Sequence, residues 1–570
     1  MAVAQEFETQ AVAPEQLQEA RQFAASYAGE HVAGTEFVIG ALFVAWGVGT
    51  YDILYGLLLG NLLAVLTWGL ITAPIATDTR LTLYAYLEKI AGPGTIKLYS
   101  VVNGILFAVL AGAMITVSAS AVRILFGIPA QVNWYPTDIS FVLVAVAVGA
   151  VVVIVAAKGF KKVAHFAEIC APWMILMFIA GALAMLPILT DAASSVSSIN
   201  NFDDFVAVAD AYIWVDTGTD IGFWHVAAFA WICNLAMHGS MGDMTLLRFA
   251  KRSSYGYFSA LGMFIGHYLA WVCAGIMGAG AALMVSSTIS QMDAGAVAYQ
   301  ALGVAGILAV IIAGWTTSNP TIYRAGLAFQ SLNYKWSLTR VTLVTGVVTT
   351  AIACFPFVFT KLLSLVGIMG LMLVPVGAII VTEHWIMPKL GMTRYWSSYR
   401  KNNTNIAAVV TWFASLALAF LLEQSGTLHL FFLLIPVWIF ATVTYLLLAS
   451  MLGARDTYKE AEPAERAELV RKQQEKQFLE DQVTSAKTAE TSSFSMGVKV
   501  SRLVSFLSLL ACAALSVVVY TTGDLASFHQ WLILPTLTYF GSASYWIINK
   551  EKQAEALKDN GDNSEAVYSH

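Results

Sequence analysis

Stretches of about 17 to 25 apolar residues recur along nearly the whole chain, and each is long enough to cross about 30 Å of hydrocarbon. The run FVLVAVAVGAVVVIVAA at residues 141–157 is typical of them. Of the 570 residues, 58% are hydrophobic and 12% are charged, whereas a soluble domain has about 25% charged residues. The strands of a membrane barrel would alternate in polarity instead of staying apolar. We therefore predict an all-α polytopic membrane protein.

The apolar stretches predict about fourteen spans, grouped as twelve followed by a final pair. We expect them near residues 20–50 (interrupted), 53–75, 98–127, 139–157, 165–189, 222–246, 255–285, 302–331, 339–354, 357–386, 405–422, 428–452, 500–520 and 529–549.

The distribution of basic residues orients these spans. When the spans alternate, all of the 31 Lys and Arg residues except Arg123 and Lys361 fall on one side, Arg324 among them in a loop. Basic loops are typical of the cytoplasmic face of a membrane protein. The first 30 residues are polar and do not resemble a signal peptide. We expect a multi-pass protein of the cell's inner membrane with both termini in the cytoplasm.

Changes in polarity divide the chain into five parts. We expect a cytoplasmic N-terminal tail at 1–19, a twelve-span core at 20–452, a polar helical linker at 453–498, a two-span hairpin at 499–550 and a cytoplasmic tail at 551–570. The linker is dense in charge and has little apolar face, which is typical of a solvated helix. The role of the linker and of the last two spans stays open.

Polar residues interrupt the apolar spans at three places. They are GEHVAGTEF at residues 29–37 in the first span, NLAMHGSMGD at 234–243 in the sixth and TTSNP at 316–320 in the eighth. Inside a bilayer an unsatisfied polar group costs several kcal/mol, so such residues face protein or a water-filled cavity. An alternative position for the first interruption is AWGVGTYD at residues 45–52.

Each interruption has a structural interpretation beside a functional one. A Thr pair in a transmembrane helix usually bonds back to its own helix. Four consecutive oxygen-bearing side chains before Pro320 favour a hard cation instead. Single histidines in apolar segments, such as His31 and His238, are more often hydrogen-bonded core residues than ligands. Glu30 and Glu36 have three interpretations: they select a cationic solute, they carry a proton, or they mark a helix end at the membrane interface.

Catalytic and cofactor signatures are missing from the sequence. It contains no HExxH or GxSxG motif and no nucleotide-binding motif, and its five cysteines are scattered singly in apolar segments. We therefore predict that the protein is not an enzyme, carries no cofactor and binds no nucleic acid. A channel is disfavoured because the helix interruptions occur at corresponding positions of the two halves of the core, whereas a channel would have a repeated pore loop.

Four stretches together resemble a known family. YDILYGLLLGNLL (51–63), GDMTLLRFAKR (242–252), WTTSNPTIYRAGLAF (315–329) and LVPVGAIIVTEHWI (373–386) are similar to the nucleobase:cation symporter-1 family, particularly its bacterial cytosine permeases. The resemblance implies a LeuT-like core of two inverted five-helix repeats, here at about residues 20–190 and 222–386. In such a core the first and sixth helices are broken, and these are the spans interrupted in this sequence.

The resemblance also implies two binding sites. A sodium ion would be held by side-chain oxygens of Thr316 and Thr317 and by carbonyls of Ala313 and of the stretch from Gly29 to Ala33. The solute would lie against the third, sixth and eighth spans, at Asn103, Phe107, Cys233, Asn234, Ala236 and Ser318.

Three positions depart from the family's nucleobase-binding members. Where those members commonly have an amide or a stacking aromatic ring, this chain has Phe107, Leu110 and Ala313. A hydrogen-bonding pattern suited to cytosine therefore does not follow.

The resemblance implies a secondary active transporter, in which Na⁺ or H⁺ drives uptake of a nucleobase-like or related small nitrogenous solute by alternating access. The alternatives are transport of another small solute, such as an organic amine, a vitamin or an amino-acid derivative, and a membrane sensor or receptor that binds without transport. The expected partners are a small molecule and the lipid bilayer, and the oligomeric state stays open.

Overall fold

The computed structural model describes residues 10–157, 160–193, 196–333, 335–485 and 495–567. These residues form helices and one isolated bridge, between Gln18 and Ala250, without any strand. Ten helices of this described part are long and apolar enough to cross a membrane, and three shorter apolar helices accompany them. The predicted all-α, multi-pass membrane protein is confirmed, while the total of fourteen spans stays a prediction.

The short helix η1 (Pro14–Gln16) precedes the first repeat. The first repeat and the helix that follows it contain α1 (Ala20–Glu30), α2 (Gly34–Val44), α3 (Thr50–Thr67), η2 (Trp68–Thr72), α4 (Ala73–Thr79), α5 (Leu83–Val122), η3 (Arg123–Phe126), α6 (Ile139–Ala156), α7 (Phe160–Ala192) and α8 (Phe202–Tyr212). The second repeat contains α9 (Phe223–Ile232), α10 (Met244–Leu247), η4 (Ser253–Phe258), η5 (Leu261–Leu269), α11 (Ala270–Met284), η6 (Ile289–Gln291), α12 (Ala294–Leu302), α13 (Val304–Gln330), α14 (Leu338–Ala353), α15 (Val358–Val381), η7 (Thr382–Ile386) and α16 (Met387–Lys389).

The remaining helices are α17 (Trp396–Tyr399), α18 (Ile406–Gln424), η8 (Leu430–Phe432), α19 (Leu434–Leu452), α20 (Ala461–Ser485), α21 (Met496–Thr522), α22 (Leu525–Trp531) and α23 (Ile533–Val567). Parts of the predicted N-terminal tail (1–9), linker (486–494) and C-terminal tail (568–570) lie outside the described residues. The predicted part boundaries otherwise stay predictions.

The contacts between helices of the two repeats are those expected for inverted repeats, because each has a counterpart in which the two repeats are exchanged. The second piece of span 1, α2, packs on α11 of span 7, and α3 of span 2 packs on α9 of span 6. Likewise α5 of span 3 packs on α14 of span 9, and α6 of span 4 packs on α13 of span 8. Each pair becomes the other when spans 1 to 5 are exchanged for spans 6 to 10.

A π-helical stretch occurs in each of two counterpart spans of the repeats, in the later part of span 2 and in the earlier part of span 7. It is η2 in span 2 and η5 in span 7, with a further one, η7, in span 10. Such a bulge interrupts the regular ladder of hydrogen bonds and is frequent at functional sites. Trp68 opens η2 and His267 lies in η5, and both belong to the site described below.

Spans 1 and 6 are interrupted, as predicted. Span 1 breaks between α1 and α2 at residues 31–33. The alternative position, residues 45–52, covers the connection between α2 and α3 (45–49) and the first three residues of α3. Span 6 unwinds after α9, where Gly242 N–H donates to Ala236 O and Asp243 N–H donates to Met237 O, six residues back in each case. A regular helix bonds four residues back, so this backbone has left the helical ladder.

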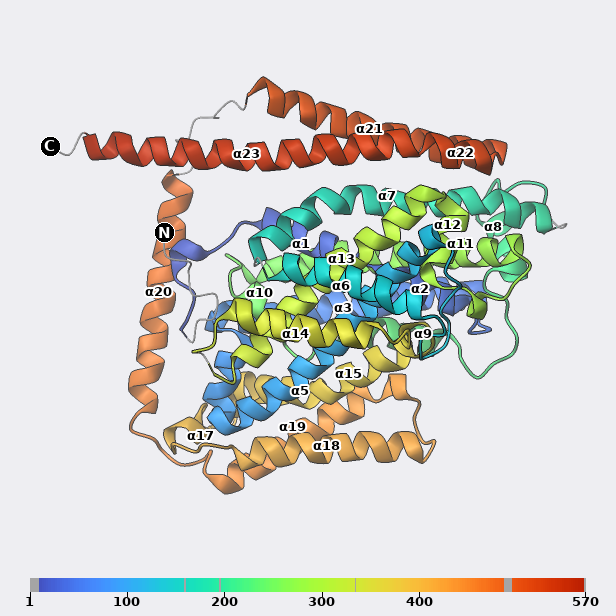
Figure 1. Ribbon diagram of the computed structural model, residues 1–570. Helices are drawn as coiled ribbons and strands as arrows, with labels where there is room; N and C mark the ends of the chain where they lie inside the picture. The colour runs from blue at the N-terminus through green and yellow to red at the C-terminus, as the bar shows by residue number, and fades with distance from the viewer. Residues whose placement is uncertain (1–9, 158–159, 194–195, 334, 486–494, 568–570) are drawn as a thin grey trace.

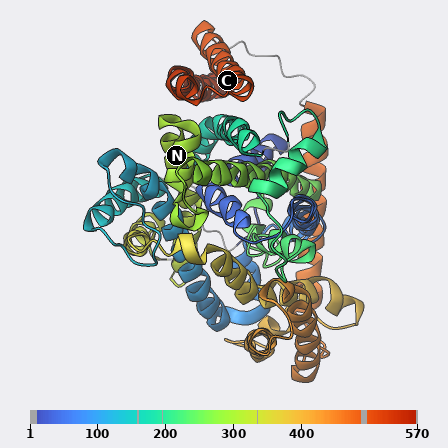
Figure 2. The same cartoon turned by 90° about the vertical axis from the view of Figure 1, so that its right-hand side faces the viewer.

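The core helices are flanked by two further layers (Figure 1). In the figure, α18 and α19 lie along the lower edge, and α21 and α23 lie side by side along the upper edge near α7. Figure 2 shows the same two layers on opposite sides of the core. The polar helix α20 runs along the ends of the core helices in Figure 1.

Candidate functional site

Close backbone packing brings the first break against span 7. A Cβ placed on Gly266 would lie 2.4 Å from the carbonyl oxygen of His31, and one on Gly262 would lie 2.6 Å from its Nδ1. Glycines four residues apart therefore open one face of η5 to the unwound chain. The ring of His31 lies 5.3 Å from that of His267.

A buried carboxylate lies directly after this break. Glu36 is 2% exposed, and it accepts hydrogen bonds from the Thr35 hydroxyl at 3.2 Å and from the Trp271 indole N–H. His267 Nε2 lies 3.6 Å from Glu36 Oε1 and 3.3 Å from the Asn234 amide nitrogen in the unwound part of span 6. We call these five residues the Glu36 cluster; they connect spans 1, 6 and 7.

A second buried group of charges joins spans 1, 2, 6 and 8. Asp243 accepts hydrogen bonds from the Tyr27 hydroxyl at 3.1 Å and from the Trp68 indole N–H at 2.7 Å. Arg324 lies 3.5 Å from Asp243 and forms a two-pronged ion pair with Glu30. We call these five residues the Asp243 cluster.

The placement of Arg324 corrects one prediction. We expected a cytoplasmic loop residue, but Arg324 lies inside α13 and its side chain is 16% exposed. The loop assignment was wrong because a count of charges cannot recognise a cation whose carboxylate partners lie on distant spans. Two acidic partners offset the cost of burying the guanidinium group.

A close helix contact lies next to two of the predicted sodium ligands, Ala33 of span 1 and Ala313 of span 8. A Cβ on Gly34 would be 2.9 Å from the backbone nitrogen of Gly314, so α2 begins directly against α13 beside Ala313. Gly29, near the end of α1, and Ala33, the last residue of the first break, are both buried.

The two predicted threonine ligands use their hydroxyl protons within α13. Thr316 and Thr317 both donate to the carbonyl oxygen of Ala313, at 3.0 and 2.8 Å. These are the back-bonds that the structural interpretation expects. Each hydroxyl oxygen retains lone pairs that can accept or coordinate, so the ligand set stays a prediction.

The predicted solute-binding residues fall into two groups. Cys233 and Asn234 lie at the start of the sixth-span break, and Asn234 is a member of the Glu36 cluster. Phe107 and Ala236 belong to one hydrophobic core cluster. Asn103 donates to the Tyr84 hydroxyl at 2.8 Å.

Several buried polar atoms on spans 3, 6, 7 and 8 have no hydrogen-bond partner among the described residues. They include Ser318 Oγ, Asn319 Oδ1, Asn103 Oδ1, His238 Nδ1 and His267 Nδ1. Buried polar groups are hydrogen-bonded in most native proteins, and exceptions often mark sites that take a ligand or water.

Sequence reasoning missed five contributors to these clusters, namely Tyr27, Trp68, His267, Trp271 and Arg324. His267 and Arg324 carried a usable signal, because an ionisable residue within an apolar span marks a functional position. The two tryptophans carried none, since their roles depend on indole N–H groups that point at carboxylates on other spans.

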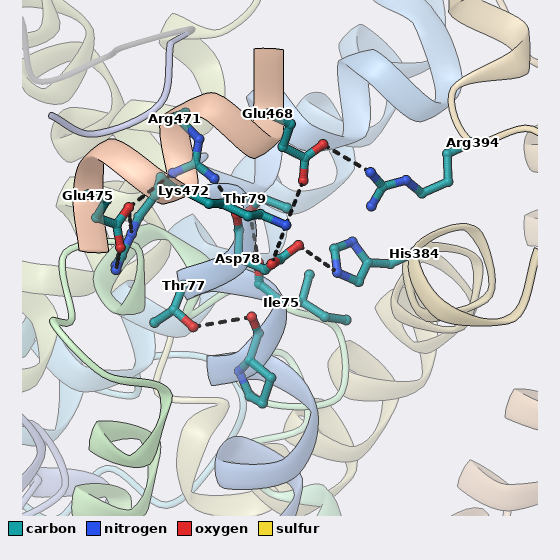
Figure 3. Close-up of polar contacts among 12 residues, drawn as sticks. Ile75, Thr77, Asp78, Thr79, His384, Arg394, Glu468, Arg471, Lys472 and Glu475 are labelled. Atoms are coloured by element: carbon teal, nitrogen blue, oxygen red, sulfur yellow. Dashed lines mark hydrogen bonds and ion pairs between the residues drawn. The ribbon is translucent and has the colours of Figure 1, made fainter. Parts of the chain in front are cut away.

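A third polar group lies where α20 meets the core (Figure 3). Lys472 and His384 both contact the carboxylate of Asp78, at 2.6 and 3.3 Å, and Glu468 pairs with Arg394 at 2.9 Å. Burial by itself would lower the pKa of Arg394, but the neighbouring Tyr395 and Glu468 raise it above its ordinary value. Arg394 is therefore charged and holds Glu468.

Arg80 extends this attachment to span 6. Its guanidinium group pairs with Glu475 through two nitrogens and donates to the carbonyl oxygens of Arg248 and Ala250. The predicted solvated helix is therefore only partly solvated, because the Glu475 and Glu468 side chains are 14% and 20% exposed. Its helical periodicity places these charges on the face that meets the core.

The fold and the buried clusters define a multi-pass helical membrane protein with two inverted five-helix repeats, whose interrupted helices meet at charged and polar side chains. In sequence, no family model and no curated protein matches the chain.

In structure, the chain is similar to several solved proteins. The chain is similar to Mhp1, a nucleobase-cation-symport-1 family transporter, in a closed conformation with bromovinylhydantoin bound. The TM-score is 0.58 at 14% identity, over 78% of this chain and 95% of that chain. The inward-facing conformation of Mhp1 matches with a TM-score of 0.57 at 13% identity, over 78% and 95% of the two chains.

A Na⁺-coupled sialic acid symporter in a substrate-bound outward-open state is also similar, with a TM-score of 0.53 at 14% identity, over 76% of this chain and 90% of that chain. At these identities the likeness concerns the fold, and it confirms the predicted LeuT-like architecture. The proteins that share this fold here are transporters and not enzymes.

Proposed function

We propose that the protein is a secondary active transporter that couples movement of Na⁺ or H⁺ to uptake of a nucleobase-like or related small nitrogenous solute by alternating access. The observation that carries the proposal is the convergence of both interrupted helices on the buried Glu36 cluster. Unwound helices at corresponding positions of two repeats are where transporters of this architecture bind their cargo. We place the protein in the inner membrane with both termini in the cytoplasm.

The Glu36 cluster supports a solute that presents N–H groups. A carboxylate is an acceptor only, while the Asn234 amide both donates and accepts. The rings of His267 and Trp271 stack at 4.4 Å and give the cluster an aromatic wall. Cys233 and Ser318 would line the same space, with Asn103, Phe107 and Ala236 towards the third span.

An organic amine is the second candidate solute. Within the described part of the chain, no Lys or Arg pairs with Glu36, whereas Glu30 and Asp243 share Arg324. A buried carboxylate without a cationic partner is costly. A positively charged amine would supply that partner.

For the coupling ion we propose the contact between the first break and α13. The oxygens of Thr316 and Thr317, the carbonyl of Ala313 and the carbonyls between Gly29 and Ala33 would surround a cation there. Clustered oxygen ligands of this kind suit a hard cation such as Na⁺.

A ligand screen tests the proposed solute class. The full-length protein in detergent would be melted with nucleobases, hydantoins, vitamins and organic amines, each with and without Na⁺. Since binding to the folded state alone stabilises it, the proposal expects a raised melting temperature for one nitrogenous class. It is contradicted if no compound of these classes has any effect. A sensor would bind equally well, so flux across a membrane decides between the two.

A further inference from the structure

Two adjoining cavities lie where α5, α13 and α14 meet, away from the broken helices. The polar pocket has a volume of about 270 Å³ and is lined by Glu88, Lys97, Asn333 and Lys335, among others. The apolar groove has a volume of about 560 Å³, and its walls include Ile105, Phe329, Val344 and Val348. Leu332 and Lys335 line both cavities, so the polar pocket opens into the apolar groove.

The walls of the apolar groove face the surrounding lipid. Val344, Val348 and Ile105 are 67%, 52% and 51% exposed within apolar spans. Exposed aliphatic side chains at this position meet lipid chains and not water.

The depth of the apolar groove fits one leaflet of a bilayer. On α14 its lining runs from Val341 to Ile352, which at about 1.5 Å per residue is roughly 16 Å. Half of the hydrocarbon core of a bilayer is about 15 Å. Trp336, 49% exposed at the mouth, is the kind of residue that lies at the membrane–water interface.

The charge at the mouth of the two cavities selects an anion. Lys97, Lys335 and Arg340 are exposed. Lys97 and Lys335 line the polar pocket together with the carboxylate of Glu88, and Lys335 and Arg340 line the apolar groove. These cations lie at the end of the molecule that we predict to be cytoplasmic. Basic pockets between spans on that side bind the headgroups of anionic lipids.

We propose that the polar pocket and the apolar groove together bind one anionic glycerophospholipid, with its phosphate among Lys97, Lys335 and Arg340 and an acyl chain along α14. The juxtaposition of a cationic pocket with an apolar groove one leaflet deep matches the division of a phospholipid into headgroup and tail. A soluble anion would use the pocket alone, and a protein partner would not need a groove of this depth.

Native mass spectrometry of the purified full-length protein tests the proposal. Phosphatidylglycerol and phosphatidylcholine with identical acyl chains would be added in equal amounts. Because each basic group near the membrane surface attracts anionic lipid, we expect the protein to retain phosphatidylglycerol at least about tenfold better. Equal retention of the two lipids by the unaltered protein overturns the proposal.

Two pairs of variants locate the lipid. The double variant Lys335→Glu/Arg340→Glu should lose the preference for phosphatidylglycerol, whereas Lys389→Glu/Lys459→Glu, with the same change in charge at exposed positions elsewhere, should keep it. Val348→Trp should fill the groove and reduce retention of both lipids. Val347→Trp, on the same helix and 68% exposed but outside the groove lining, should leave retention unchanged.

Inorganic phosphate separates a lipid site from a plain anion site. Phosphatidylglycerol should raise the melting temperature of the protein, and inorganic phosphate at the same concentration should not. If inorganic phosphate stabilises the protein equally, or if both members of a variant pair behave alike, the lipid assignment is wrong. None of these readouts depends on transport.

Discussion

Glu36 and His267 face each other at 3.6 Å, one just after the first helix break and the other within the π-helical stretch of span 7. The two residues are far apart in the sequence, and both side chains are almost completely buried. An ionisable pair that joins the two repeats inside a membrane indicates a functional position.

Removal of the Glu36 charge should abolish most solute uptake. Glu36→Gln keeps the shape of the side chain but removes a charged acceptor, and hydrogen bonds to charged groups contribute about 1.5 to 3 kcal/mol. Uptake at low solute concentration should therefore fall roughly tenfold to a hundredfold. The exposed Glu423→Gln serves as the control. Unchanged uptake by Glu36→Gln would exclude the Glu36 cluster from the solute site.

Asn234 should set the affinity for the solute. Asn234→Leu keeps the approximate volume but removes both amide functions beside His267, so the dissociation constant should rise about tenfold. Isothermal titration of the purified variant measures this change. Asn549→Leu, which replaces a partly exposed amide on α23, should bind as the unaltered protein does. An unchanged dissociation constant for Asn234→Leu would place the solute elsewhere.

The threonine pair of α13 should govern the response to the cation. Thr316→Ala/Thr317→Ala removes two oxygens from the proposed ion site, so half-maximal stimulation of uptake should require about tenfold more Na⁺. Thr316→Ser/Thr317→Ser retains both hydroxyls and should respond normally. If the alanine variant keeps the normal Na⁺ response while the protein is well folded, the hydroxyls serve only their own helix.

The ion pair between Arg80 and Glu475 should hold α20 against the core. Glu475→Ala leaves the buried guanidinium group without its partner, which costs about 3 kcal/mol and should lower the melting temperature by several degrees. Glu462→Ala removes an exposed partner of Arg466 on the same helix, and such pairs contribute about 0 to 1 kcal/mol. Equal melting temperatures for the two variants would show that α20 is not anchored here.

The sequence was sufficient for the fold because spans and breaks are local features. Long apolar stretches predict the helices, and the runs at residues 29–37 and 234–243 marked both interruptions within a few residues. The resemblance to a family then supplied the repeat architecture, which the solved structures confirm at 13–14% identity.

The candidate site was only partly predictable, because its side chains come from spans far apart in the sequence. Asn234 and Glu36 were recognisable as polar residues in apolar surroundings. The pairing of Arg324 with Glu30, 294 positions away, depends on how α13 packs against α1. No periodicity contains that information, so Arg324 was counted as a loop charge.

Gradient-driven accumulation in proteoliposomes tests the proposed transport function most directly. The full-length protein would be reconstituted with the solute that stabilises it best, and the radiolabelled solute inside the vesicles would be measured under an inward Na⁺ or H⁺ gradient. The proposal predicts accumulation above the external concentration, which disappears when an ionophore dissipates the gradient. Binding without entry, or entry that no cation gradient alters, would contradict it.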